Sequence, residues 1–164
     1  MFSTKKWWIT SAAAMALGLF LLISAAQAEQ PYDITVCTAG TNAVLFSSKD
    51  LTIISTESKG ITISNHENKA FDNNTLQCAG VIQIANGKPS GHIFCKFLEP
   101  DGDVTVGEST LDGAEGTWKF IYGTGKWKGI TGGGKNWPIT KGKSVAPGTS
   151  QGCRKATGTY QLPE

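Results

Sequence analysis

The stretch "CAGVIQIANGKPSGHIFC" (residues 78–95) places two β-rich segments on either side of Asn86-Gly87. Asn-Gly is the strongest short signal for a two-residue β-hairpin turn, because both positions tolerate positive φ. If these two residues form the turn, Ala85 faces Lys88, and counting outward brings Cys78 opposite Cys95. The stretch therefore predicts an antiparallel hairpin closed by a Cys78–Cys95 disulfide.

The position of Pro89 agrees with this register. Counting outward from the hydrogen-bonded 85/88 pair, both 84/89 and 78/95 are non-hydrogen-bonded pairs, in which side chains lie closest. Proline has no N–H to donate, and none is needed there. Of the three ways to pair four cysteines, this one leaves Cys37 to bond Cys153 and so ties the first strand to the last.

The first 28 residues have the features of a secretory signal peptide. Lys5 and Lys6 precede an apolar run over residues 12–26, and Ala26 and Ala28 are small residues at the positions that signal peptidase reads. We expect cleavage after Ala28 and a periplasmic or secreted mature chain, with an uncleaved anchor as the alternative. An oxidising compartment agrees with two disulfides.

Residues 29–164 are expected to form one domain of nearly balanced charge. Without Lys5 and Lys6, the 15 lysines and arginines fall to 13, which equals the number of aspartates and glutamates. Such a domain has no broad positive field for nucleic acid or anionic lipid, and no further apolar stretch approaches twenty residues. We therefore expect neither a nucleic-acid partner nor membrane attachment after cleavage.

The mature sequence has no sustained apolar repeat at helical spacing. Short β-rich segments recur instead, and turn compositions such as "ESKG" and "EPDGD" separate them. Strands are expected near residues 33–37, 51–56, 60–65, 75–85, 90–98, 103–109, 116–122, 130–138 and 157–162. The pattern predicts an all-β fold, a single antiparallel up-and-down β-barrel of about eight strands, because closure removes exposed edges. Residues 141–154 are expected to form a long loop, either a ligand lid or a plain surface loop.

The stretch "GTGKWKGITGGG" (residues 123–134) is rich in glycine but does not fit a phosphate-binding loop. It lacks GxxxxGK followed by Ser or Thr, and it does not open a helix after a parallel strand. It resembles the GTGKxxGixGxG signature of small secreted bacterial barrels of the allene oxide cyclase-like and wider calycin-type group, over about residues 103–160. The resemblance implies an antiparallel barrel whose apolar interior holds one small ligand.

Candidate site residues follow from the strand alternation. Trp118, Tyr122 and Trp127 are the expected ligand-binding walls, although core packing explains these aromatic residues equally well. Glu108 continues the alternation that begins with Val104 and Val106 and can point into the barrel, where burial would raise its pKa and make it an acid. His92 is the other catalytic candidate, although it falls on the more polar face of its hairpin.

Other site chemistry is not indicated. The acidic residues of "EPDGD" fit a type I turn rather than a calcium loop, and the cysteines show no zinc spacing. No GxSxG motif is present. We expect neither a metal nor a cofactor.

The sequence favours an exported barrel that binds a small hydrophobic molecule in its interior. The first alternative is a cyclase, isomerase or lyase that acts on an apolar, epoxide-like substrate in the same cavity. The second is a protein-binding module, such as an inhibitor of a periplasmic hydrolase, that uses loops at one rim.

Overall fold

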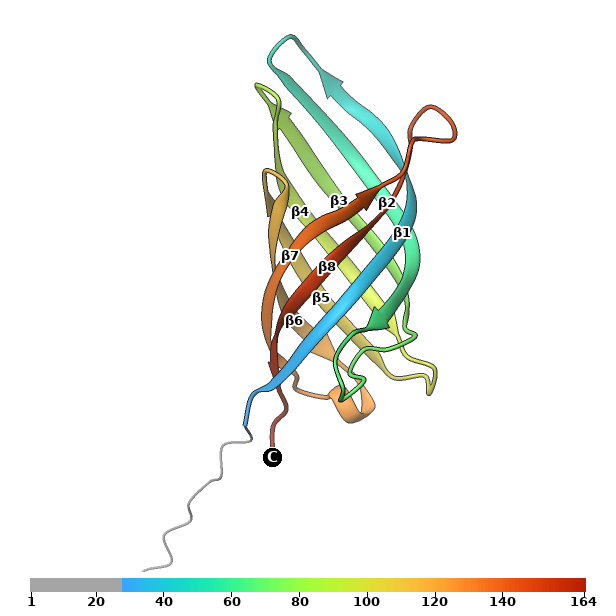
Figure 1. Ribbon diagram of the computed structural model, residues 1–164. Helices are drawn as coiled ribbons and strands as arrows, with labels where there is room; N and C mark the ends of the chain where they lie inside the picture. The colour runs from blue at the N-terminus through green and yellow to red at the C-terminus, as the bar shows by residue number, and fades with distance from the viewer. Residues whose placement is uncertain (1–27) are drawn as a thin grey trace, which may run out of the picture.

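The structure is a computed structural model that describes residues 28–164, so residues 1–27 of the expected leader lie outside the described residues. The described chain forms a closed antiparallel β-barrel in which each strand pairs with the next and the last pairs with the first (Figure 1). The strands are β1 (Gln30–Ser47), β2 (Leu51–Ser64), β3 (Thr75–Ala85), β4 (Lys88–Leu98), β5 (Val104–Asp112), β6 (Glu115–Gly123), β7 (Thr131–Lys141) and β8 (Thr149–Gln161). The prediction of an up-and-down barrel with eight strands is confirmed.

The two ends of the barrel differ. The turns β1–β2, β3–β4, β5–β6 and β7–β8 gather at one end, here called the hairpin end (Figure 1). The segments 65–74, 99–103 and 124–130, the last containing the 3-10 helix η1 (Gly125–Trp127), gather at the other end, here called the base. The longest connection, residues 65–74, therefore lies at the base, where it can cover the interior.

The predicted register of the β3–β4 hairpin is confirmed. Ala85 pairs with Lys88 and Cys78 with Cys95, and the turn residues Asn86 and Gly87 have φ of 50° and 79°. Both predicted disulfides, Cys78–Cys95 and Cys37–Cys153, are present. The turn chemistry and the two bridges therefore fix the same alignment of strands.

Several strands are longer than the sequence predicted. The segment "ESKG" (residues 57–60) is not a turn, because β2 runs through it and pairs with β1 on one side and β3 on the other. Two flanking strands supply backbone hydrogen bonds that outweigh the local turn preference. Likewise, β8 begins at Thr149, so the expected loop over residues 141–154 is shorter than predicted.

Strand alternation separates the two disulfides. Cys78 and Cys95 are buried in the interior together with Leu76 and Phe97. Val36 and Arg154 line the interior, so their chain neighbours Cys37 and Cys153 lie on the outer face. One bridge thus forms part of the lining of the barrel, and the other joins β1 to β8 from outside.

The disulfides suggest that the protein resides in an oxidising, extracytoplasmic compartment. Within residues 28–164, no helix is sufficiently long and apolar to cross a membrane.

Candidate functional site

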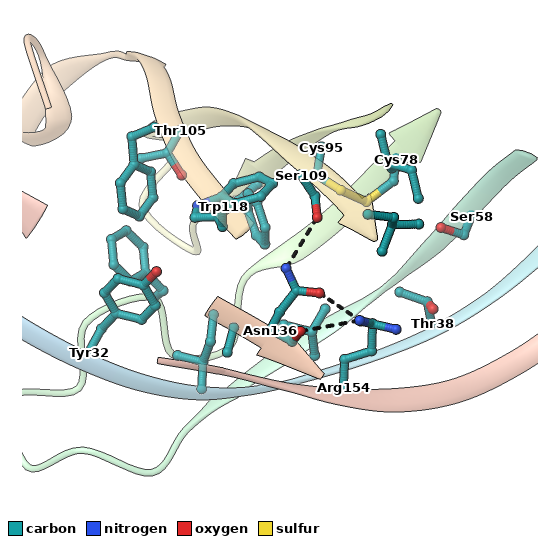
Figure 2. Close-up of a pocket in the computed structure, with 18 of the residues that line it drawn as sticks. Tyr32, Thr38, Ser58, Cys78, Cys95, Thr105, Ser109, Trp118, Asn136 and Arg154 are labelled. Carbon is teal, nitrogen blue, oxygen red and sulfur yellow. Dashed lines mark hydrogen bonds between the residues drawn. A yellow bond between two sulfur atoms is a disulfide. The ribbon is translucent and has the colours of Figure 1, made fainter. Parts of the chain in front are cut away.

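A cavity of about 250 Å³ lies inside the barrel, lined by side chains from all eight strands (Figure 2). Its lining is largely aliphatic and aromatic, with a few polar groups on one side. For comparison, an engineered apolar cavity of about 150 Å³ takes up a benzene molecule. The interior therefore has room for one small ring-bearing molecule.

The burial of inward-facing residues decreases toward the hairpin end. Along β1, Tyr32 and Ile34 near the base are buried, whereas Val36 and Thr38 are half-exposed. Along β3, Cys78 is buried, and the inward residues nearer the turn are again half-exposed. The cavity therefore opens toward the hairpin end.

Aromatic residues form the floor of the cavity at the base. The Phe71 ring stacks on Trp127 at 4.6 Å and on Phe120 at 5.2 Å between ring centroids. Tyr32 packs edge-on against Phe71 at 5.6 Å. Burial raises the pKa of the Tyr32 phenol well above its ordinary value. These rings close the base and leave the hairpin end as the route into the cavity.

Thr62 holds the segment that carries Phe71. Its hydroxyl donates to the Phe71 carbonyl oxygen and accepts a hydrogen bond from the Asn74 N–H at 3.2 Å. Its backbone N–H donates to the Asn74 carbonyl, and its carbonyl accepts from the Asn73 N–H, both at 3.0 Å. One buried residue of β2 therefore positions the floor.

A buried carboxylate lies beneath the floor. Glu99 accepts a hydrogen bond from the Trp127 indole N–H at 2.7 Å and forms an ion pair with Lys126. Hydrogen bonds to Asp101 and Glu99 raise the pKa of Lys126 to about 12. Glu99 is not part of the cavity lining, so this cluster supports the base and does not face a ligand.

Trp118 forms one wall of the cavity and depends on a glycine. Its indole packs edge-on against Phe97, with centroids 5.4 Å apart. The ring also covers Gly107 on β5, where an added Cβ would lie 2.0 Å from Cζ2. The missing side chain at position 107 leaves the space that the indole occupies.

The polar side of the lining consists of Arg154, Asn136 and Ser109. The Arg154 guanidinium donates from Nε to Asn136 Oδ1 at 2.8 Å, and the Asn136 amide donates to Ser109 Oγ at 3.1 Å (Figure 2). Arg154 Nη2 also donates to the Ala114 carbonyl in the β5–β6 turn at 2.8 Å. Among residues 28–164, Arg154 is the one cation in the cavity lining, and it lies at the hairpin side.

The three predicted wall residues lie in different places. Trp118 lines the cavity, and Trp127 is buried in the floor below it. Tyr122 is exposed on the outer face. A β-bulge places one extra residue, Ile121, between the residues that pair with Val106 and Gly107, which reverses the alternation at Tyr122.

The two catalytic candidates lie together outside the barrel. The Glu108 carboxylate pairs with His92 and Lys119, each at 2.8 Å. Hydrogen bonds from Lys119 and His92 lower the Glu108 pKa, so the expected inward carboxylate with a raised pKa is wrong. Its neighbour Ser109 faces the cavity, so alternation turns Glu108 outward.

Sequence reasoning missed Arg154 and Asn136. Arg154 fell in a segment read as a loop, and Asn136 in a strand whose inward face had not been assigned. A usable signal existed, because the predicted Cys37–Cys153 bridge implies that Val36 pairs with Arg154, as it does in the structure. Extending that register would have placed the arginine on the inner face.

The sequence matches no protein-family model and no curated protein. Among solved structures, the barrel is similar to the pterocarpan synthase dirigent protein GePTS1, with a TM-score of 0.52 and 9% sequence identity. The alignment covers 94% of this chain and 100% of that one. The likeness is one of fold. It places the chain among eight-strand barrels and assigns no residue a role.

Proposed function

We propose that the protein is an exported barrel that binds one small, mainly hydrophobic molecule in its interior. The cavity of about 250 Å³ between Trp118 and the aromatic floor is the observation that carries this proposal. Ligand sites are typically concave, mostly apolar and furnished with a few polar groups that orient the ligand. The resemblance to allene oxide cyclase-like barrels and the dirigent-type fold both accord with a ligand-holding interior.

The cyclase, isomerase or lyase alternative receives less support. Acid–base catalysis requires a group of suitable pKa within hydrogen-bond reach of the substrate. Within residues 28–164, no carboxylate and no histidine lines the cavity; the ionisable groups there are Arg154 and Tyr32. A lumen filled by side chains would favour the alternative of a protein-binding module that uses loops at one rim. This lumen instead contains a cavity.

The proposal is tested by isothermal titration calorimetry with the neutral probe naphthalene-2-methanol. Ile82 lines the cavity, and Ile82→Phe should fill part of it and weaken binding. Its chain neighbour Val81 is exposed, so Val81→Phe is the matched control and should bind like the wild type. Saturable binding that Ile82→Phe weakens supports the proposal. No binding, or equal binding by both variants, would refute it.

A further inference from the structure

Within residues 28–164, every group that accepts a hydrogen bond from Arg154 is neutral. Its guanidinium donates to Asn136 Oδ1 at 2.8 Å, to the Asn136 carbonyl at 3.3 Å and to the Ala114 carbonyl at 2.8 Å. Ser109 fixes the orientation of the Asn136 amide by accepting a hydrogen bond from Nδ2. These contacts position the cation but do not neutralise its charge.

The charge of Arg154 has no partner in the described chain. In residues 28–164, the acidic groups that form ion pairs do so with lysines or with His92, and none with Arg154. Burial lowers the pKa of Arg154 from its ordinary value. A desolvated charge is costly unless a counter-charge compensates it. The partly buried, uncompensated charge of Arg154 therefore favours binding of an anion next to it.

The guanidinium also has donors left for such a partner. Arg154 Nη1 donates no hydrogen bond within residues 28–164. It is also not one of the fully buried polar atoms without a partner, so it remains accessible to a ligand. Thr38 lies two positions along β1 from Val36, the residue that pairs with Arg154, and it lines the same cavity. Figure 2 shows the Arg154 guanidinium between Asn136 and Thr38. A group that enters from the hairpin end therefore meets Nη1 and the Thr38 hydroxyl, and neither has a hydrogen-bond partner within the described part of the chain.

We infer that the ligand is an amphipathic carboxylic acid, whose carboxylate pairs with Arg154 near the mouth and whose apolar body lies against Trp118 and Phe97. This inference rests on the proposed binding function and specifies the class of ligand. Arginine presents N–H donors in a planar fork that suits carboxylate oxygens. The aromatic wall below suits a ring or an unsaturated chain.

The wild-type test compares two probes with the same ring system. Naphthalene-2-carboxylate is charged at neutral pH, and naphthalene-2-methanol is not. Hydrogen bonds to charged groups are stronger than neutral ones, and we expect the carboxylate to bind at least about tenfold more tightly. If neither probe binds, the proposed function fails. If both bind equally, the function stands and the inference about the acid is overturned.

The variant test removes the charge at two adjacent positions. Arg154→Gln should weaken carboxylate binding by at least about tenfold and change alcohol binding by less than about threefold. Lys155 is the next residue of β8 and pairs with Asp33 on the outer face. Lys155→Gln removes the same formal charge and should leave both affinities unchanged. Circular dichroism establishes that each variant is folded.

Two results of the variant test would overturn the inference: a carboxylate preference that persists in Arg154→Gln, and an equal loss for both probes. Should Arg154→Gln not fold, the wild-type comparison still decides, because it needs no substitution.

Discussion

The indole of Trp118 covers Gly107 on the neighbouring strand so closely that an added Cβ would lie 2.0 Å from its Cζ2 atom. The wall of the cavity is therefore set by a residue without a side chain. The pairing of Ser109 with Trp118 in the β5–β6 register places the ring over this glycine.

Gly107→Ala should destabilise the barrel and weaken binding of naphthalene-2-methanol. The methyl group forces the indole toward the cavity, and overpacking of this kind costs about 1–3 kcal/mol. Urea unfolding measures the free energy. Gly142→Ala is the control, because Gly142 is exposed and an added Cβ there first meets the Gln151 side chain rather than the wall of the cavity. A Gly107→Ala protein with wild-type stability and affinity would show that the indole is not held as described.

The same substitution should affect the stability of the protein differently at two buried threonines. Thr62 and Thr105 are both 0% exposed. The Thr62 hydroxyl makes two hydrogen bonds at the floor, whereas the Thr105 hydroxyl has no partner in residues 28–164. Thr62→Val should therefore cost about 1–3 kcal/mol, and Thr105→Val should be neutral or stabilising. Chemical denaturation of the two variants in parallel measures the difference, and equal losses would contradict the assignment.

The two disulfides should contribute unequally to stability. Cys37–Cys153 closes a loop with a sequence separation of 116, and Cys78–Cys95 one of 17. In the chain-entropy model these loops give about 5 and about 3 kcal/mol. The Cys37→Ala/Cys153→Ala pair should therefore unfold at lower urea than the Cys78→Ala/Cys95→Ala pair. The reverse order would mean that packing inside the barrel outweighs loop closure.

The ion pairs that Glu108 forms with His92 and Lys119 on the outer face predict that the stability of the protein depends on pH. Hydrogen bonds from Lys119 and His92 lower the pKa of Glu108 from 4.5 in the folded state. In the unfolded state the pKa of Glu108 is 4.5. The ionised carboxylate therefore stabilises the folded protein above this pH, and the stabilisation is lost as the pH falls through the lower folded-state pKa. Glu108→Gln should lower the melting temperature at neutral pH, and this effect should diminish as the pH falls below 4.5. Glu57, which forms no ion pair in residues 28–164, provides the control Glu57→Gln. A loss that persists in acid would exclude the ionised carboxylate as its source.

The register of the β3–β4 hairpin could be predicted because short-range chemistry determines it. Asn86-Gly87 fixes one turn, and the position of Pro89 and the two flanking cysteines select the same register. That local alignment needs no knowledge of distant strands. The length of β2 could not be obtained in this way, because its central residues are held by pairing on both sides.

The site was harder to predict because alternation fails where strands are irregular. The bulge at Ile121 moves Tyr122 outward, and no residue in that stretch signals the change. The inward polar group, Arg154, interrupts the apolar pattern on which strand prediction depends. Trp118 was found because its strand is regular up to the bulge.

The indole N–H resonance of Trp118 provides the sharpest test of ligand binding in the lumen. Residues 28–164 contain three tryptophans, of which Trp118 lines the cavity, Trp127 lies in the floor and Trp137 does not line the cavity. In a titration with naphthalene-2-methanol, followed by nitrogen–proton correlation spectra, the Trp118 signal should shift saturably while that of Trp137 stays in place. A shift of Trp137 with Trp118 unchanged, or no shift at all, would be incompatible with a ligand in the barrel.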